Sequence, residues 1–268
     1  MATKKTHSRR KTLSAAGAAA VAAVASTRAR AADERTVLIT GANRGLGLEF
    51  VRQYMTRNYR IIGTARRPDE AKEFKALTKD YAKVSLETLD VTDVAAVDAL
   101  AKKLRGTPID VLINNAGVIG EAEKEQWGTM PYAHFDNVMN TNVKGPLKIS
   151  EALIDNVAAS TEKKIIVVSS VEGSLASVRG WARPFYRASK AAVNMIMRNV
   201  ALAVKDRGVL IGLVCPGGTD TDMTAIFRGK YKMRSVNEAV TDMIRLIDLL
   251  TPERSAISYN FDGNVMPW

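Results

Sequence analysis

The sequence predicts an α/β fold, a doubly wound parallel sheet in one domain, on the strength of three observations. Short apolar runs recur from Thr36 onward, and amphipathic stretches of about ten residues or more separate several of them. No internal repeat and no long linker interrupts the alternation. Strands that alternate with helices of this length are joined by right-handed crossovers, which place the strands parallel in a single sheet.

The expected strands are short runs rich in Val, Ile and Leu, as buried parallel strands are. They cover residues 37–39, 60–65, 84–89, 110–113, 164–169 and 209–214, and residues 256–259 add a seventh. Helices are expected over 46–57 and 94–104, and another carries Tyr186 and Lys190.

The composition limits the chemistry. With 268 residues, 46% of them hydrophobic, the chain has enough apolar material for one core. A single cysteine, Cys215, excludes an internal disulfide, and two histidines, His7 and His134, make a metal site or a histidine triad improbable. We therefore expect no metal, a buried Cys215 and a surface His134, with acid–base chemistry resting on other groups.

The net charge of +11 does not indicate nucleic-acid binding. Seven basic residues and no acid lie in residues 1–31, so the rest of the chain carries only +4. Its remaining Lys and Arg are interleaved with Asp and Glu, as on a solvated helix surface. We expect no nucleic-acid partner.

Residues 1–31 have the parts of an export signal: a basic head, an alanine-rich middle from Leu13 to Ser26, and a small-residue end before Ala32. The middle is too short to span a bilayer stably. The segment 8–13, S-R-R-K-T-L, resembles the twin-arginine motif, with Thr12 where phenylalanine is usual. We expect a protein exported by the twin-arginine route to the periplasm or beyond. The alternatives are an organellar transit peptide and a disordered tail. If the segment is not a signal, we expect a cytoplasmic protein. The domain then covers 32–268.

A glycine-rich loop, T-G-A-N-R-G-L-G over residues 40–47, follows the first strand. Glycines let the chain turn tightly and let backbone N–H groups approach a pyrophosphate at the helix N-terminus. A glycine triplet alone is a weak signal, but its place between the first strand and first helix strengthens it. The spacing G-x-x-x-G-x-G resembles that of the short-chain dehydrogenase/reductase family, which has a Rossmann fold.

Cofactor choice follows from charge at the end of the second strand. An NAD enzyme usually places an acid there for the ribose 2′-hydroxyl, whereas this chain has Ala65 followed by Arg66 and Arg67. An arginine can pair with the 2′-phosphate of NADP, and Arg44 could reach it too. We predict NADP; the alternative is that these arginines are solvated loop charges. Asp90 resembles the family's adenine contact, with a helix cap as its alternative.

Tyr186 and Lys190 lie four residues apart, one turn of a helix, so their side chains share a face. A phenol with a pKa of about 10 is a poor acid–base group at neutral pH, and a nearby ammonium would lower that pKa. The spacing is common by chance. It gains weight from Val167-Val168-Ser169-Ser170, which resembles the family's serine motif and offers Ser170 to a substrate carbonyl.

Further segments resemble the family in order: Asn142 in N-T-N-V-K-G, Asn114-Asn115-Ala116-Gly117, and Cys215-Pro216-Gly217 with Thr219 and Thr221 beyond. The resemblance implies that Asn142 orders a water near the lysine. It implies a catalytic set of Asn142, Ser170, Tyr186 and Lys190. The cofactor residues it implies are Gly41, Asn43, Arg44, Gly45, Leu46, Gly47, Arg66, Asp90, Val91, Asn115, Ala116, Gly117, Tyr186, Lys190, Pro216, Gly217 and Thr219.

One departure concerns the loop between Ser170 and Tyr186, which are sixteen residues apart where most members have thirteen. This long form resembles the C-factor and sniffer-type carbonyl reductase branch. The added length, within 172–184, affects specificity rather than chemistry. Ser169 is the rival for the serine role, but strand alternation points only one of the two at the site.

We therefore expect an NADP-dependent oxidoreductase that reduces a carbonyl, or oxidises the alcohol, with Tyr186 as proton donor or acceptor. The alternative is a C-factor-like nucleotide-binding signalling or scaffold protein with little turnover. The partner is a small molecule, without stable membrane insertion. A homodimer or homotetramer could form through the Tyr186 helix, where Met195, Ile196, Val200 and Val204 are either core or an oligomer face.

Overall fold

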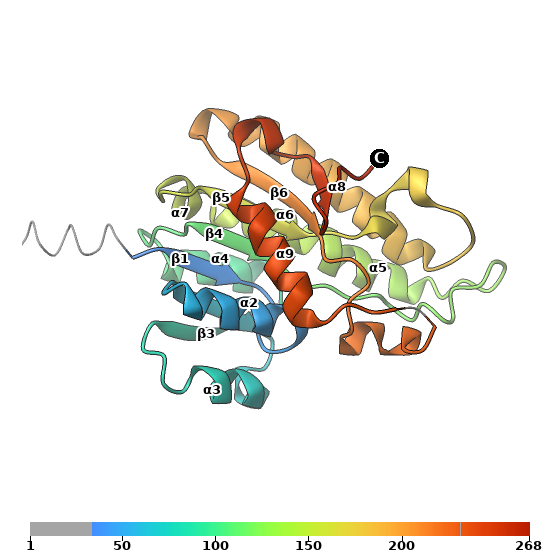
Figure 1. Cartoon of the computed structure of the whole chain (residues 1–268), viewed down its shortest axis with the longest axis horizontal. Helices are drawn as coiled ribbons and strands as arrows, with labels where there is room; N and C mark the ends of the chain where they lie inside the picture. The colour runs from blue at the N-terminus through green and yellow to red at the C-terminus, as the bar shows by residue number, and fades with distance from the viewer. Residues whose placement is uncertain (1–33, 231) are drawn as a thin grey trace, which may run out of the picture. The chain divides into compact units, whose positions relative to one another are not determined.

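Seven parallel strands form one sheet in the computed structural model, which describes residues 34–230 and 232–268 (Figure 1). The strand order is β3-β2-β1-β4-β5-β6-β7. The bounds are β1 Thr36–Ile39, β2 Arg60–Ala65, β3 Val84–Thr88, β4 Val111–Asn114, β5 Lys164–Val168, β6 Leu210–Cys215 and β7 Ser258–Asn260. Each strand lies within two residues of its predicted position, so the predicted fold class is confirmed.

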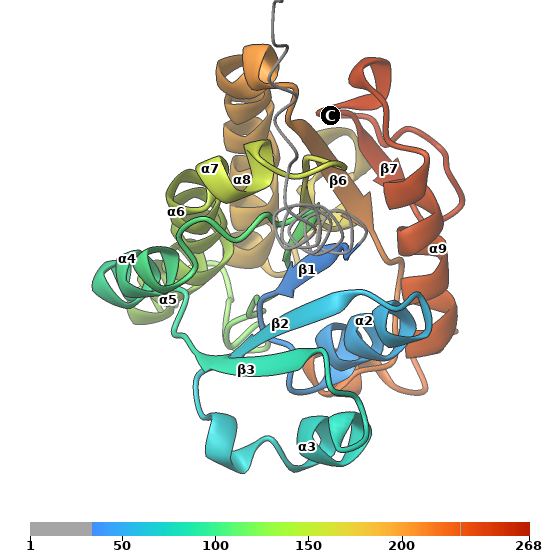
Figure 2. The ribbon, with the colours of Figure 1, turned by 90° about the vertical axis from the view of Figure 1, so that its left-hand side faces the viewer.

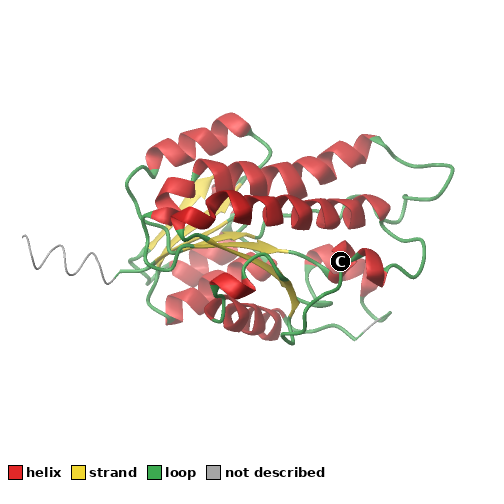
Figure 3. Cartoon of the chain, turned by 90° about the horizontal axis from the view of Figure 1, so that it is seen from above, coloured by secondary structure: helices red, strands yellow, loops and turns green. Residues whose placement is uncertain are grey.

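Helices cover both faces of the sheet, as the views in Figures 2 and 3 show. Helices α2 and α9 lie on one face and α4, α6 and α8 on the other. The helices are α2 Gly45–Thr56, α3 Lys72–Thr78, α4 Val94–Lys103, α5 Ala133–Met139, α6 Gly145–Ala152, α7 Ile154–Ala158, α8 Pro184–Val204 and α9 Val236–Asp248. The expected helices at 46–57 and 94–104 are therefore α2 and α4.

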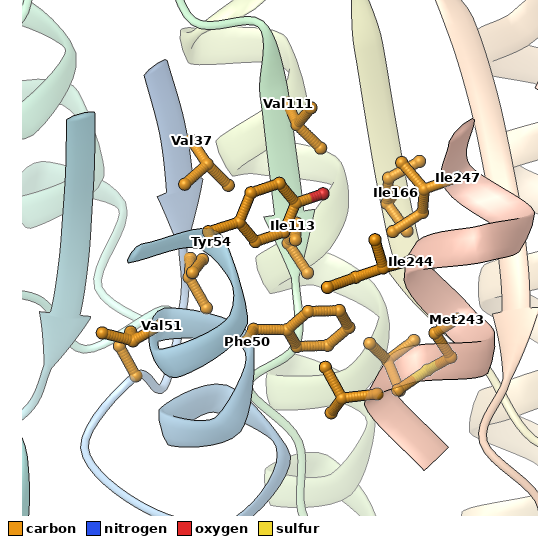
Figure 4. Packing of buried hydrophobic residues seen from close by; sticks show 14 of the residues in the cluster. Val37, Phe50, Val51, Tyr54, Val111, Ile113, Ile166, Met243, Ile244 and Ile247 are labelled. Atoms are coloured by element: carbon orange, nitrogen blue, oxygen red, sulfur yellow. The ribbon is translucent and has the colours of Figure 1, made fainter. Parts of the chain in front are cut away.

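Two apolar cores follow from the alternation of side chains along the strands. Val37 of β1 points to the α2/α9 face, where it packs with Phe50 and Met243 (Figure 4). Ile39 belongs to the same core, whereas Leu38 belongs to the core on the opposite face of the sheet. All five of these side chains are fully buried. A strand that is buried on both faces reads as an unbroken apolar run, which is why these strands could be located in the sequence.

The strand order reverses between β1 and β4, which lie side by side in the middle of the sheet. The connection after β1 crosses to one face through α2, and the connection after β4 leads towards α5 on the other side. A crevice opens at the carboxyl ends of the strands at such a switch point, and ligands bind there in open α/β sheets. The site is therefore expected beside residues 40–47 and 115–118.

The segment between β5 and α8 contains two short 3-10 turns, η3 Val171–Gly173 and η4 Leu175–Ser177, before α8 begins at Pro184. Along α8, Val204 is buried, Ile196 and Val200 pack at the edge of the core, and Met195 is 62% exposed. Three of these four side chains of α8 therefore pack in or against the core. The role of α8 in an oligomer stays a prediction.

Among the described residues, no helix is both long and apolar enough to cross a membrane. Residues Arg35–Trp268 form one compact unit. The predicted export signal, residues 1–31, lies outside the described residues, so export by the twin-arginine route stays a proposal.

Candidate active site

A cleft of about 940 Å³ lies where the sheet was expected to open. The glycine loop, the ends of β2, β4, β5 and β6, and the first turns of α8 all contribute to its wall. It therefore runs without interruption from the loop at residues 41–46 to Ser170, Tyr186 and Lys190. The predicted cofactor and catalytic residues meet in one cavity.

The glycine loop is shaped in a way that only glycine permits. Gly41 and Gly45 have φ angles of 64° and 54°, in the left-handed region that other residues avoid. A Cβ atom on Gly47 would lie 2.0 Å from the carbonyl oxygen of Gly41. The backbone at Gly47 therefore packs closer to the backbone at Gly41 than a side chain at residue 47 would allow. A ligand in the cleft can approach the backbone of this loop equally closely.

The N-terminus of α2 is open to an anion. Arg44 occupies the N-cap position and its side chain makes no cap hydrogen bond, and the first turn has no acidic residue. The first N–H groups of this helix thus lack the partners that a Ser or Asp cap would give. These groups, with the positive end of the helix dipole, fit a pyrophosphate.

Asn115 ties the loop to the end of β4. Its side-chain Nδ2 donates to the carbonyls of Thr40 and Gly41, at 2.9 and 3.2 Å. The Thr40 hydroxyl in turn accepts from the backbone N–H groups of Asn115 and Ala116, both at 3.0 Å. Asn115 thus holds the shape of the loop, and it lines the cleft together with Ala116 and Gly117.

Arg66 is the cation that stands free at the end of β2. It is exposed and lines the cleft, and no carboxylate within the described ranges lies in ion-pair distance of it. Its neighbour Arg67 pairs with Glu70 at 3.1 Å. Arg44 reaches across the cleft mouth to Asp222, at 3.1 Å, so Arg66 rather than Arg44 is the better partner for a 2′-phosphate.

Asp90 and Val91 form the wall beside Arg66. The backbone N–H and the hydroxyl of Thr92 both donate to Asp90, at 2.9 and 2.7 Å. Burial opposes ionisation of Asp90, but these hydrogen bonds and the Arg66 charge outweigh it and lower its pKa. The helix-cap alternative for Asp90 is wrong, because Asp93 caps α4 by accepting from the N–H of Ala96.

The segment after β6 forms the opposite wall, with Pro216, Gly217 and Thr219 lining the cleft. Gly217 has φ 73°, and a Cβ there would meet the ring of Phe261 at 2.7 Å. The Thr219 hydroxyl donates to the carbonyls of Pro216 and Gly217 at 3.3 Å, so it fixes the turn. Cys215 is buried, as expected.

Tyr186 and Lys190 share one face of α8 beside the cleft. The Lys190 Nζ donates to the carbonyl of Val168 at 2.9 Å and lies 5.6 Å from the centre of the Tyr186 ring. Only 7% of Lys190 is exposed. The ammonium is thus anchored at the end of β5 rather than bonded to the phenol oxygen.

Burial moves the pKa values of these two groups in opposite directions, because it penalises the charged form of each. It raises the pKa of Tyr186 to about 12, although a hydrogen bond from Ser170 and the charge of Arg183 act to lower it. It lowers the pKa of Lys190 to about 8. Contrary to the prediction, Lys190 does not bring the pKa of Tyr186 below its ordinary value, because burial outweighs the influences that lower it. Tyr186 is held in its protonated form, the form of a proton donor.

Ser170 and Ser169 are separated by the alternation of the chain. The hydroxyl of Ser169 donates to Asn194 of α8, at 2.7 Å, in the buried core. Ser170 lines the cleft and hydrogen-bonds with Tyr186. Ser170 is therefore the serine that a substrate can reach, and Ser169 holds β5 to α8.

Asn142 lies in a π-helical segment, Asn140–Lys144, between α5 and α6. Its side chain accepts from the N–H of Val118 and donates to the carbonyl of Val118 and to Ser189, at 2.8 to 3.0 Å. These bonds use the amide to join the β4 end to α8. The role of Asn142 in ordering a water stays a prediction.

Three charged residues of the substrate side were missed in the sequence: Glu172, Arg183 and Arg187. All three line the cleft next to Ser170 and Tyr186. The signal that could have found them is their closeness in the sequence to the catalytic residues. Glu172 lies two residues after Ser170, whereas Arg183 lies three residues before Tyr186 and Arg187 one residue after it. The predicted surface histidine, His134, lies in α5 and pairs with Glu121 at 3.1 Å.

The model of the short chain dehydrogenase family matches residues 35–232, which includes every predicted site residue. The chain belongs to the short chain dehydrogenase family. This is the family predicted from the glycine loop, the serine motif and the Tyr186–Lys190 pair.

Three proteins show how similar this short-chain dehydrogenase is to known relatives in sequence and structure. A short-chain dehydrogenase/reductase of Burkholderia multivorans, solved with bound NADP, is 27% identical with a TM-score of 0.78, covering 88% of this chain and 100% of that one. Carbonyl reductase Sniffer of D. melanogaster has a TM-score of 0.80 at 23% identity, over 88% and 100% of the two chains, and shows the shared fold. The C-signal protein of Myxococcus xanthus is 33% identical over 173 residues, 63% of this chain and 99% of its own.

Proposed function

We propose that this short-chain dehydrogenase is an NADPH-dependent carbonyl reductase. The observation that carries the proposal is that Ser170 and Tyr186 face one cleft that continues to the glycine loop. Their hydrogen bond and the high pKa of Tyr186, about 12, provide a neutral acid where a carbonyl oxygen would sit.

The cofactor prediction is confirmed by the Burkholderia relative, which binds NADP. In this chain the residues fit the dinucleotide: the uncapped N-terminus of α2 suits its pyrophosphate, and Arg66, which has no ion pair with any described carboxylate, suits a 2′-phosphate. Bound NADPH supplies the hydride for the carbonyl carbon.

The side chains then divide the remaining work. Ser170 donates a hydrogen bond to the carbonyl oxygen, where negative charge develops during reduction. Tyr186 donates the proton to the same oxygen. Lys190, whose Nζ donates to the carbonyl of Val168, would bind the nicotinamide ribose through its ammonium group. Asn142 keeps the ends of β4 and α8 in register through Val118 and Ser189.

The non-catalytic alternative, a signalling or scaffold protein, has no observation of the site in its favour. A nucleotide binder needs the glycine loop and a lysine for the ribose, whereas nothing in nucleotide binding explains the Ser170 hydroxyl beside the Tyr186 phenol at the other end of the cleft. Buried ionisable groups are costly, which makes them informative about chemistry.

The test is NADPH oxidation by the purified protein with a panel of aldehydes and ketones, followed at the nicotinamide absorbance. We expect turnover with NADPH, slower turnover with NADH, and a loss of about 100-fold or more in kcat for Tyr186→Phe with NADPH binding retained. Tight NADPH binding without oxidation across a broad panel would instead favour the non-catalytic alternative.

A further inference from the structure

The substrate end of the cleft carries more positive than negative charge. Its charged lining beyond Lys190 includes Glu172, Arg183, Arg187 and Lys232, together with Asp222, which pairs with Arg44. The side chains of Glu172, Arg183 and Arg187 are only 20 to 21% exposed, so water screens their charges weakly. Among these weakly screened groups, the one carboxylate, Glu172, faces two cations, Arg183 and Arg187.

Glu172 holds the two arginines in position. Its two oxygens accept separately, from Arg183 NH2 at 2.8 Å and from Arg187 Nε at 2.5 Å. Burial opposes the charge of Glu172, but the two guanidinium groups outweigh it and lower its pKa. The carboxylate is ionised and neutralises one of its two partners, which leaves one positive charge over.

Arg183 is the arginine with donors to spare. Arg187 gives a second group, NH1, to the carbonyl of Gly180 at 2.6 Å. Glu172 is the one hydrogen-bond acceptor for Arg183 among the described residues, and the guanidinium lies over the ring of Phe227, 4.8 Å from its centre. The fork is thus fixed in direction while most of its N–H groups remain available.

Arg183 also occupies a special place in the chain. Its φ of 45° lies in the left-handed region, directly before Pro184 begins α8. A non-glycine residue held there by its surroundings is a feature found at functional sites. Arg183 lines both the main cleft and an adjoining cavity of about 200 Å³, and its charge is close enough to act on the Tyr186 phenol.

We propose that the substrate is a carbonyl compound that carries a carboxylate, and that Arg183 binds this carboxylate. The proposal rests on the proposed function and deepens it by naming the substrate class. A planar guanidinium pairs with a carboxylate through two parallel hydrogen bonds, so it fixes the distance and angle between acid group and carbonyl. Glu172 then acts as a positioning residue that prevents Arg183 from turning into solvent.

The experiment compares oxo acids with their methyl esters, which keep the carbonyl and lose the charge. In the wild type we expect a higher kcat/KM for the acid than for its ester. Arg183→Met should lower the ratio of the two kcat/KM values by about tenfold or more, as the loss of a hydrogen bond to a charged group does, chiefly through KM of the acid. Any effect of the substitution on Tyr186 is common to both substrates and cancels in the ratio.

Arg179→Met is the matched control, because Arg179 lies in the same loop but is exposed and bonds only to backbone carbonyls of Ala176 and Val178. It should leave the ratio unchanged. A second measurement needs no variant: phenylacetate should compete with an ester substrate of the wild type at least tenfold better than neutral phenylacetamide.

An unchanged acid-to-ester ratio in Arg183→Met, equal inhibition by phenylacetate and phenylacetamide, or a wild-type preference for esters would overturn the carboxylate proposal while the reductase stands. Failure of both acids and esters to oxidise NADPH would overturn the reductase itself, so the two failures are distinguishable.

Discussion

Lys190 is the residue whose charge state the structure makes most sensitive to pH. Burial at the end of β5 lowers its pKa from the ordinary 10.5 to about 8, so the ammonium loses its proton in the mildly alkaline range. Tyr186, with a pKa of about 12, stays protonated throughout that range. Of the two residues, Lys190 therefore changes its charge within the pH range in which activity can be measured.

We predict that kcat/KM for NADPH, which reports the free enzyme, is level below pH 8 and falls as pH rises through it, because neutral Lys190 no longer attracts the ribose. Lys190→Arg should lose this alkaline limb, even at a lower overall rate, because guanidinium does not deprotonate in proteins. A profile that is flat to pH 10 in the wild type contradicts this assignment.

The sequence located Tyr186 and Lys190 but not their pKa values. Their four-residue spacing can be read directly, whereas the surroundings that shift the pKa of Lys190 include Val168 of β5 and Cys215 of β6, which are distant in the chain. For the same reason the sequence missed Arg183: its partner Glu172 and its ring contact Phe227 come from separate loops.

Between β5 and α8, the short turn η3 packs directly on the helix that carries the catalytic pair. A Cβ on Gly173 would lie 2.9 Å from the backbone carbonyl carbon of Lys190 and 2.9 Å from the side-chain Nδ2 of Asn194. Because the backbone of a helix cannot yield, any side chain at this glycine must push η3 and Ser170 away from α8.

We predict that Gly173→Ala lowers the free energy of unfolding by about 1–3 kcal/mol, the cost of overpacking, and lowers kcat together with it. Gly180→Ala is the control, since no atom lies within 4 Å of a Cβ there, and it should change stability by no more than about 0.5 kcal/mol. Urea denaturation and turnover measure both effects. Equal behaviour of the two variants would show that η3 does not rest on α8 as described.

The elements that could be predicted are those whose signal is local. Helix α9 also has such a signal, because Ser235 and Glu238 form a capping box before an amphipathic run. The π-helical turn at Asn142 and the two 3-10 turns had none, because contacts with Val118, Ser189 and α8 decide their geometry.

At the scale of the whole molecule, the strand order places the cleft. Reversal between β1 and β4 brings the glycine loop and the residues after β4 to one edge of the sheet, and β5 and β6 continue the same edge toward Ser170 and Pro216. The sequence predicted the parallel sheet from its apolar runs. It predicted which segments meet at this edge only through the family resemblance, because order in a sheet is a tertiary property.

The central claim is that this cleft transfers a hydride to a carbonyl carbon with Tyr186 as the acid. Mass spectrometry of the alcohol formed with NADPH dideuterated at nicotinamide C4 tests it most directly. The account predicts one deuterium on the carbinol carbon, with product nearly absent for Tyr186→Phe. Alcohol without deuterium, or labelled alcohol formed by Tyr186→Phe at the wild-type rate, would contradict it.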